Sequence, residues 1–211
     1  MKATSELAFE SFLDENKLPF KKIEEFKVAH TKWQSKQQLE TEQGQQLTRR
    51  PDYLVQIGDV KLMFEIKELA RDKDFAGGNR TIGGHVRRKI KEARGQLRYA
   101  TAQGIPAVLL VYNDLDREFS FGTEGHDFIA AIYGEYTLAF DRSTGARVDA
   151  FHGRNQSMRE EWNTEFSAVG RLKRSSERMV VTLFENVFSQ VNIPYEKLPA
   201  CFDVIRVKIS A

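Results

Sequence analysis

The residues 105–112 (IPAVLLVY) form an uninterrupted apolar run, and this run constrains the fold more than any other feature of the chain. Its length is that of a β-strand. A strand that is apolar at every position is buried on both faces, as in the centre of a parallel sheet covered by helices. The run therefore predicts a central strand of an α/β protein.

The segments before this run support the same fold class. Residues 53–57 and 60–67 have the composition of strands that meet at a tight turn through Gly58-Asp59. Residues 85–103 follow and have apolar side chains at helical spacing: Val86, Ile90, Ala93, Leu97 and Ala100. A strand, a helix and a buried strand in this order indicate a right-handed crossover and an α/β sheet.

The rest of the chain gives weaker signals. Residues 4–16 predict a helix whose buried side holds Phe9, Phe12 and Leu13. Residues 136–140 and 147–151 predict a hairpin, and 165–172, 179–184 and 202–209 predict further strands. We expect residues 1–211 to form a single α/β domain, with 114–211 as a C-terminal extension of unknown role.

Composition excludes several classes of protein. The chain is 41% hydrophobic and 29% charged, which is typical of a globular domain. Its one cysteine, Cys201, forms no internal disulfide and builds no cysteine zinc site. Glu6 and Glu10 interrupt the segment where a signal peptide needs apolar residues, and no apolar run is long enough to span a bilayer. We therefore expect a cytoplasmic protein.

Charge is distributed unevenly along the chain. The formal net charge is only +2, but residues 71–98 contain nine basic and three acidic residues. Such a local excess suits a polyanion such as DNA, with RNA as an alternative. A solvated helix face would also explain it. The candidate nucleic-acid-binding residues are Arg80, Arg87, Arg88, Lys91 and Arg94.

Two carboxylates and a lysine form the most informative pattern. Alternate residues of a strand share a face, so Glu65 and Lys67 point the same way. A two-residue turn at Gly58-Asp59 places Asp52 opposite Glu65, with Cβ atoms about 4.5–5.5 Å apart. Two carboxylates this close repel each other unless one is protonated or a cation lies between them, and Mg²⁺ and Mn²⁺ prefer such oxygen ligands. A hairpin with a solvated polar face and a Glu65–Lys67 ion pair is the alternative.

The residues Pro51-Asp52, followed by a short hairpin and then Glu65-Ile66-Lys67, resemble the signature of the PD-(D/E)xK nuclease superfamily, the restriction-endonuclease-like enzymes. The resemblance covers residues 1–113. It implies a core of a helix, three antiparallel strands, a crossover helix and a strand. It also implies a metal site made by Asp52, Glu65 and the backbone carbonyl of Ile66, with Lys67 as a catalytic residue.

Two further features are similar to those of the superfamily. Many members carry a glutamate on the first helix that reaches the metal, and Glu6 is the better candidate here, since Glu10 is expected to point further from the buried face. Some members carry a glutamine and a tyrosine on the crossover helix, which Gln96 and Tyr99 resemble with a spacing one residue shorter. An exposed helix carboxylate and a plain surface amide are the alternatives for Glu6 and Gln96.

The resemblance implies a Mg²⁺- or Mn²⁺-dependent endonuclease that hydrolyses phosphodiester bonds in DNA. A catalytically inactive nucleic-acid-binding module on the same fold is one alternative, and an α/β protein-interaction domain is another. A homodimer is suggested only by analogy with enzymes that cut two strands.

Overall fold

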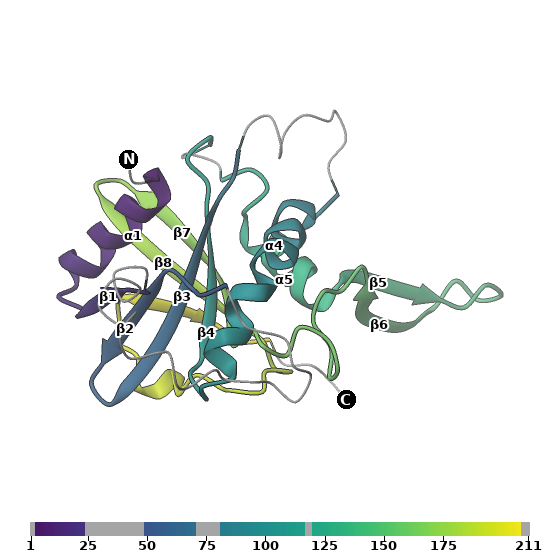
Figure 1. Ribbon diagram of the computed structural model, residues 1–211. Coiled ribbons are helices and arrows are strands. Elements are labelled where there is room, and N and C mark those ends of the chain that lie inside the picture. Colours follow the sequence, from purple (N-terminus) through teal and green to yellow (C-terminus); the bar gives the residue numbers. More distant parts are fainter. Residues whose placement is uncertain (1–2, 24–48, 71–80, 117–119, 208–211) are drawn as a thin grey trace.

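The protein is described here by a computed structural model that covers residues 3–23, 49–70, 81–116 and 120–207. These residues form a mixed α/β structure around a seven-stranded sheet with the order β1-β2-β3-β4-β7-β8-β9 (Figure 1). β1, β2 and β3 pair antiparallel, β3, β4 and β7 pair parallel, β8 is antiparallel to β7, and β9 is parallel to β8. The strands are β1 (Phe20–Lys22), β2 (Tyr53–Ile57), β3 (Val60–Glu68), β4 (Ala107–Tyr112), β7 (Ala168–Ser175), β8 (Arg178–Glu185) and β9 (Phe202–Ile205).

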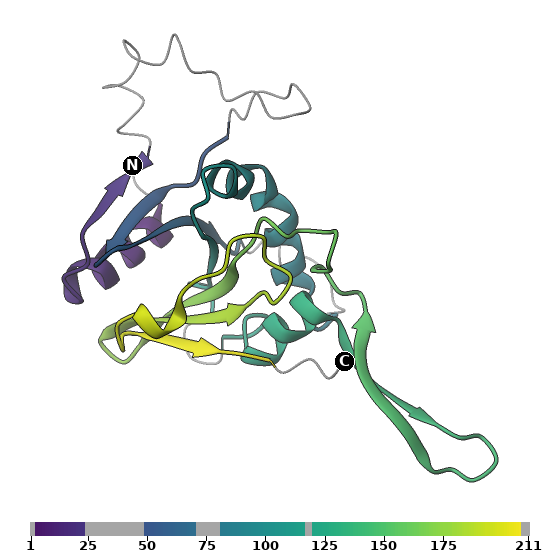
Figure 2. The same ribbon diagram turned by 90° about the horizontal axis from the view of Figure 1, so that it is seen from below.

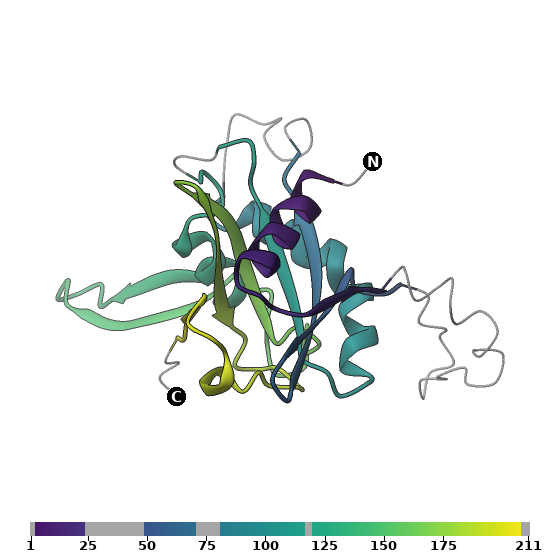
Figure 3. The ribbon, with the colours of Figure 1, turned by 90° about the vertical axis from the view of Figure 1, so that its left-hand side faces the viewer.

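Helices cover both faces of this sheet. α1 (Thr4–Glu15) lies across one face, and α4 (Gly84–Thr101) and α5 (Gly125–Tyr133) lie on the other (Figure 3). The apolar residues divide accordingly. Phe9 and Phe12 of α1 pack with Phe64 of β3 in one core, whereas Met63 of β3 packs with Ile90 of α4 in the other. Successive residues of β3 therefore face different helices, and Glu65 shares the α4 side with Met63.

The predicted α/β class and its central strand are confirmed. All six residues of β4 are buried, and β4 lies between β3 and β7. The range 53–57 matches β2, and the predicted helix 85–103 corresponds to α4. The strand expected at 165–172 begins only at Ala168, and the one expected at 202–209 ends at Ile205.

Two elements, β1 and α5, were not predicted from the sequence. β7, β8 and β9, which come from residues 114–211, extend the same sheet as the first half of the chain. β5 (Glu135–Phe140) and β6 (Arg147–Arg154) form the predicted hairpin as a separate two-stranded sheet (Figure 2). Among the described residues, no helix has both the length and the apolar composition needed to cross a bilayer.

Candidate metal centre

The turn between β2 and β3 has the register that the sequence predicts. Gly58 adopts a φ of 58°, a conformation that glycine tolerates, and Ile57 faces Val60. The pairing continues to Tyr53, which faces Phe64, so that Asp52 and Glu65 follow one step further along each strand. The Asp52 N–H donates to the Phe64 carbonyl at 2.9 Å, which keeps Asp52 against β3.

At this end of the hairpin, the Asp52 side chain accepts a hydrogen bond from the backbone of β3, in place of a backbone carbonyl of the neighbouring strand. Its Oδ2 accepts a hydrogen bond of 2.8 Å from the Ile66 N–H. The N–H and C=O of one strand residue point to the same side of the strand. The Ile66 carbonyl therefore points to the side of β3 on which Asp52 lies, as the proposed ligand set requires.

Glu65 is a buried carboxylate with only one of its oxygens paired. The residue is 2% exposed, and its Oε1 lies 2.6 Å from Lys67 Nζ. Its Oε2 is buried and accepts no hydrogen bond from any described residue. Burial, followed by repulsion from Asp52, raises the pKa of Glu65 to about 8, although Lys67 acts in the opposite direction. A divalent cation between Asp52 and Glu65 would offset both the cost of burying the charged Glu65 carboxylate and its repulsion from Asp52.

One flank of α4 lies beside the segment that leads into Asp52. A Cβ on Gly95 would lie 3.5 Å from Arg49 Cδ, and the Arg50 guanidinium lies 5.1 Å from the centre of the Tyr99 ring. Gln96 lies between Gly95 and Tyr99 in the sequence of α4. Its Oε1 is buried and, like Glu65 Oε2, accepts no hydrogen bond from the described residues. Gln96 therefore has a buried amide oxygen on the part of α4 that lies near the residues preceding Asp52.

The glutamates of α1 pair with Lys22 on the face of the sheet that α1 covers, which is opposite to the face of Glu65 and Lys67. Lys22 Nζ lies 2.7 Å from Glu6 Oε2 and 3.0 Å from Glu10 Oε1, and the Tyr53 hydroxyl donates to Glu10. Glu10 is the more buried of the two, with 14% of its side chain exposed against 33% for Glu6, so the expectation that it points further away was wrong. A metal-binding role for Glu6 stays a prediction.

Most of the candidate nucleic-acid-binding residues have intramolecular contacts. Arg87 donates to the carbonyls of Ile82 and Ala130, and Arg88 contacts His85 Nδ1 at 3.1 Å. Arg94 pairs with Glu165 at 2.9 Å and lies over the Trp162 ring at 4.1 Å. Lys91 is exposed, and Arg80 lies outside the described residues. These contacts favour a structural role for Arg87 and Arg94.

Arg171 is a cation of this face that the sequence analysis missed. Lys67 pairs with Val111 of β4, which pairs with Arg171 of β7, so all three side chains face α4 and α5. Arg171 donates to the Thr123 carbonyl at 3.4 Å, while its buried Nε donates to no described residue. Burial lowers its pKa, against the influence of Asp203 and Glu124. The sequence signal that could have identified Arg171 is its position as a charged residue within the apolar segment AVGRL.

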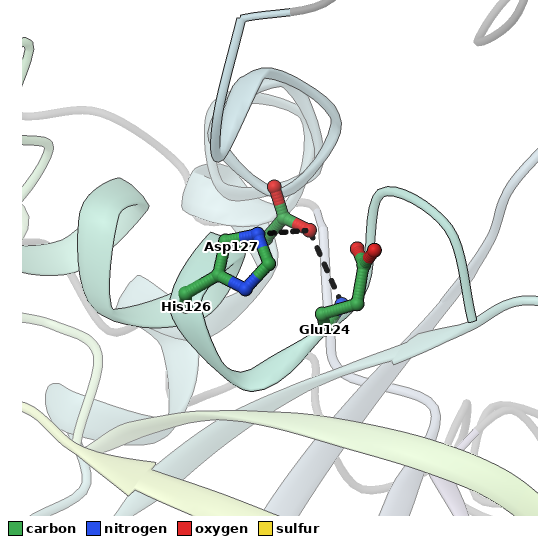
Figure 4. A group of neighbouring side chains, drawn as sticks. All are labelled: Glu124, His126 and Asp127. Atoms are coloured by element: carbon green, nitrogen blue, oxygen red, sulfur yellow. Dashed lines mark hydrogen bonds and ion pairs between the residues drawn. The ribbon is translucent and has the colours of Figure 1, made fainter. Parts of the chain in front are cut away.

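A second acidic cluster has a structural explanation. Potential ligand atoms of Glu124, His126 and Asp127 lie within 4.8 Å of one another (Figure 4). However, Asp127 accepts hydrogen bonds from the Gly83 and Glu124 N–H groups, and Glu124 accepts one from Gly122. Glu124 and Asp127 form a capping box at the start of α5, a role that needs no metal.

Comparisons with known proteins add no relative. No protein-family model matches the chain, and no curated protein and no solved structure is significantly similar to it. The chemistry of the site therefore depends on the residues described above.

Proposed function

We propose that this protein is a metal-dependent nuclease of the PD-(D/E)xK type that hydrolyses phosphodiester bonds in DNA. The order α1, β1, β2, β3, α4 and β4 is the order of elements that this superfamily has in its core. The observation that carries the proposal is the buried Glu65 carboxylate, which has one oxygen without a donor and lies beside Asp52. In its ionised form such a group is costly in a protein unless a cation compensates it.

Each residue of the site has a chemical role in this proposal. Asp52, Glu65 and the Ile66 carbonyl supply hard oxygen ligands of the kind that Mg²⁺ and Mn²⁺ prefer. A metal held by these residues would supply polarisation of a phosphate oxygen and a lowered pKa for a bound water molecule. Lys67, held 2.6 Å from Glu65, orients that water and offsets the negative charge that develops on the phosphate. Gln96, on the flank of α4, is suited to hold the water or the phosphate through its amide.

Two alternatives use the same fold differently. A nucleic-acid-binding module without catalysis would need the exposed basic residues but would not need Glu65 to be buried beside Asp52. A protein-interaction domain would need neither. The Asp52, Glu65 and Lys67 constellation favours the nuclease over both.

The proposal is tested by incubating supercoiled plasmid with the protein and either Mg²⁺ or Mn²⁺. We expect nicking that EDTA abolishes. Asp52→Asn and Lys67→Ala should each reduce the rate by roughly 10²-fold or more. Lys61→Ala is the matched control, because Lys61 is an exposed lysine at the other end of the same strand. It should retain the wild-type rate.

The other outcomes separate the alternatives. Retention of plasmid in a gel without cleavage would indicate the binding module. If the protein neither binds nor cuts DNA or RNA, the protein-interaction domain is the remaining reading. Cleavage that is equally fast in Asp52→Asn would place the active site elsewhere.

A further inference from the structure

The hairpin of β5 and β6 projects from the rest of the molecule as a two-stranded arm (Figures 1 and 2). Alternate residues of β5 on one face of this arm are large, apolar and exposed: Tyr136 by 59%, Leu138 by 44% and Phe140 by 56%. An isolated two-stranded ribbon is marginally stable in water. A row of exposed apolar side chains along it marks an interaction surface.

A pocket of about 600 Å³ lies at the root of the same face. Tyr136 and His152, which are cross-strand partners, form part of its wall. Leu138 pairs with Ala150 two residues further along, so the pocket and the apolar row lie on one side of the arm. The pocket is lined by Ile82, His126, Ile129, Ala130, Glu135, Tyr136 and His152.

The charges of the arm argue for a protein partner. Residues 135–154 contain three acidic residues and three arginines, so the arm has no net charge with which to attract DNA or an anionic membrane. Acidic and basic residues occur at both ends of the arm. Asp141 and the exposed Arg142 lie at the tip, whereas Glu135 lies at the root in the wall of the pocket, opposite Arg154 of β6.

We propose that this face is a homodimer interface in which two arms lie antiparallel. With a two-fold axis near Leu138, Phe140 of one copy enters the partner's pocket, and Arg142 approaches the partner's Glu135. A two-fold interface requires one patch to be complementary to itself, and the arm has this property in both its apolar row and its charges.

The exposed area of the arm approaches what such a dimer needs. Half-exposed side chains of this size add on the order of 100 Å² each, so the three on each of two arms contribute about 600 Å² in total. The walls of the two pockets add to this area, and a specific interface needs about 1,000 Å². A strand rises by about 3.4 Å per residue, so Phe140 lies about 14 Å from Tyr136, within reach of a pocket on an antiparallel partner.

Sedimentation velocity of the full chain tests this interface. We expect a reversible dimer, and we expect Leu138→Asp and Phe140→Asp each to raise its dissociation constant by roughly tenfold or more. Both positions are exposed, so circular dichroism should show an unchanged fold. Leu7→Asp is the matched control, since Leu7 is 52% exposed on α1, away from the arm, and it should leave the dimer intact. A wild-type protein that is monomeric at tens of micromolar, or a dimer that Leu138→Asp leaves intact, would overturn the proposal.

A charge exchange tests the antiparallel arrangement itself. Arg142→Glu alone and Glu135→Arg alone should each weaken the dimer, and the double variant should restore it. The absence of this rescue would contradict the tip-to-root contact. Neither experiment depends on nuclease activity, so the dimer and the proposed function can fail separately.

Discussion

At the scale of single residues, the buried Glu65 carboxylate lowers the stability of the folded protein, although the proposed activity requires it. Its carboxylate is buried, shares a site with Asp52 and has one oxygen without a donor among the described residues. A structural ion pair with Lys67 would explain one oxygen but not the other. A divalent ion is a partner that satisfies both carboxylates, whereas without one the raised pKa of Glu65 keeps this carboxyl protonated up to about pH 8.

The pKa of Glu65 makes the stability of the metal-free protein depend on pH. Since burial and Asp52 raise this pKa from 4.5 to about 8, the folded state binds a proton that the unfolded state has already lost. With respect to this group, stability is therefore at its full value below about pH 4.5, and it decreases as the pH rises through 8. We expect a loss on the order of 4 kcal/mol between about pH 4.5 and 8, measured by urea denaturation in EDTA.

Glu65→Gln is the variant that isolates this effect. This substitution should remove the decrease in folding stability with rising pH, so that the variant is more stable than the wild type at pH 8 in EDTA. Mg²⁺ should then stabilise the wild type at pH 8 but not Glu65→Gln. If the two proteins have the same pH dependence, Glu65 is not the titrating group and the site is not strained as described.

At the scale of elements, Lys22 joins α1 to the edge of the sheet. Its ammonium group binds Glu6 and Glu10 of α1 and lies 5.2 Å from the centre of the Tyr53 ring. Burial lowers the pKa of Lys22, but the hydrogen bonds to Glu6 and Glu10 outweigh this and raise it. This clamp fixes the three-residue strand β1, which has few apolar residues of its own.

Lys22→Met should therefore destabilise the protein by about 1–3 kcal/mol, because it leaves two carboxylates close together without their cation. Urea denaturation at pH 7 measures the change. Lys61→Met, an exposed position on β3, is the control and should change stability by less than about 0.5 kcal/mol. An equal effect of both substitutions would mean that the clamp contributes nothing beyond the loss of a surface charge.

At the scale of the whole molecule, the sequence predicts elements whose side chains have a clear period. The apolar run of β4 and the helical spacing of apolar residues in α4 were sufficient to predict these two elements. β1 was missed because a three-residue strand of Phe20, Lys21 and Lys22 has no pattern to read, and it forms by pairing with β2. α5 was missed because it has only nine residues, most of them apolar, which is too short a stretch to show a helical period clearly.

The candidate site was predictable as far as local pairing determines it. The two-residue turn fixes the register, and from the register follows the approach of Asp52 to Glu65. The surroundings depend on contacts between distant segments. Glu6 meets Lys22 only after β1 has joined the sheet, and Arg171 reaches the face of Lys67 through two strand pairings. Neither the Glu6–Lys22 contact nor the position of Arg171 can be predicted from the spacing of residues along the chain.

Gly170 tests whether the two halves of the chain form one cooperative sheet. It lies on β7, directly beside Leu110 of β4, and a Cβ there would lie 2.6 Å from Leu110 Cδ2 and 2.9 Å from the Thr182 carbonyl oxygen. The second contact is with backbone, so the strand pairing must shift, and Gly170→Ala should cost about 1–3 kcal/mol. Urea unfolding followed by circular dichroism and by tryptophan fluorescence should show one lowered transition in both signals. Gly84→Ala is the control, since its Cβ would be 3.8 Å from Thr81 Cβ in the first turn of α4 and should be neutral or stabilising. Two separate transitions, with only one lowered by Gly170→Ala, would show instead that β4 and β7 belong to units that unfold independently.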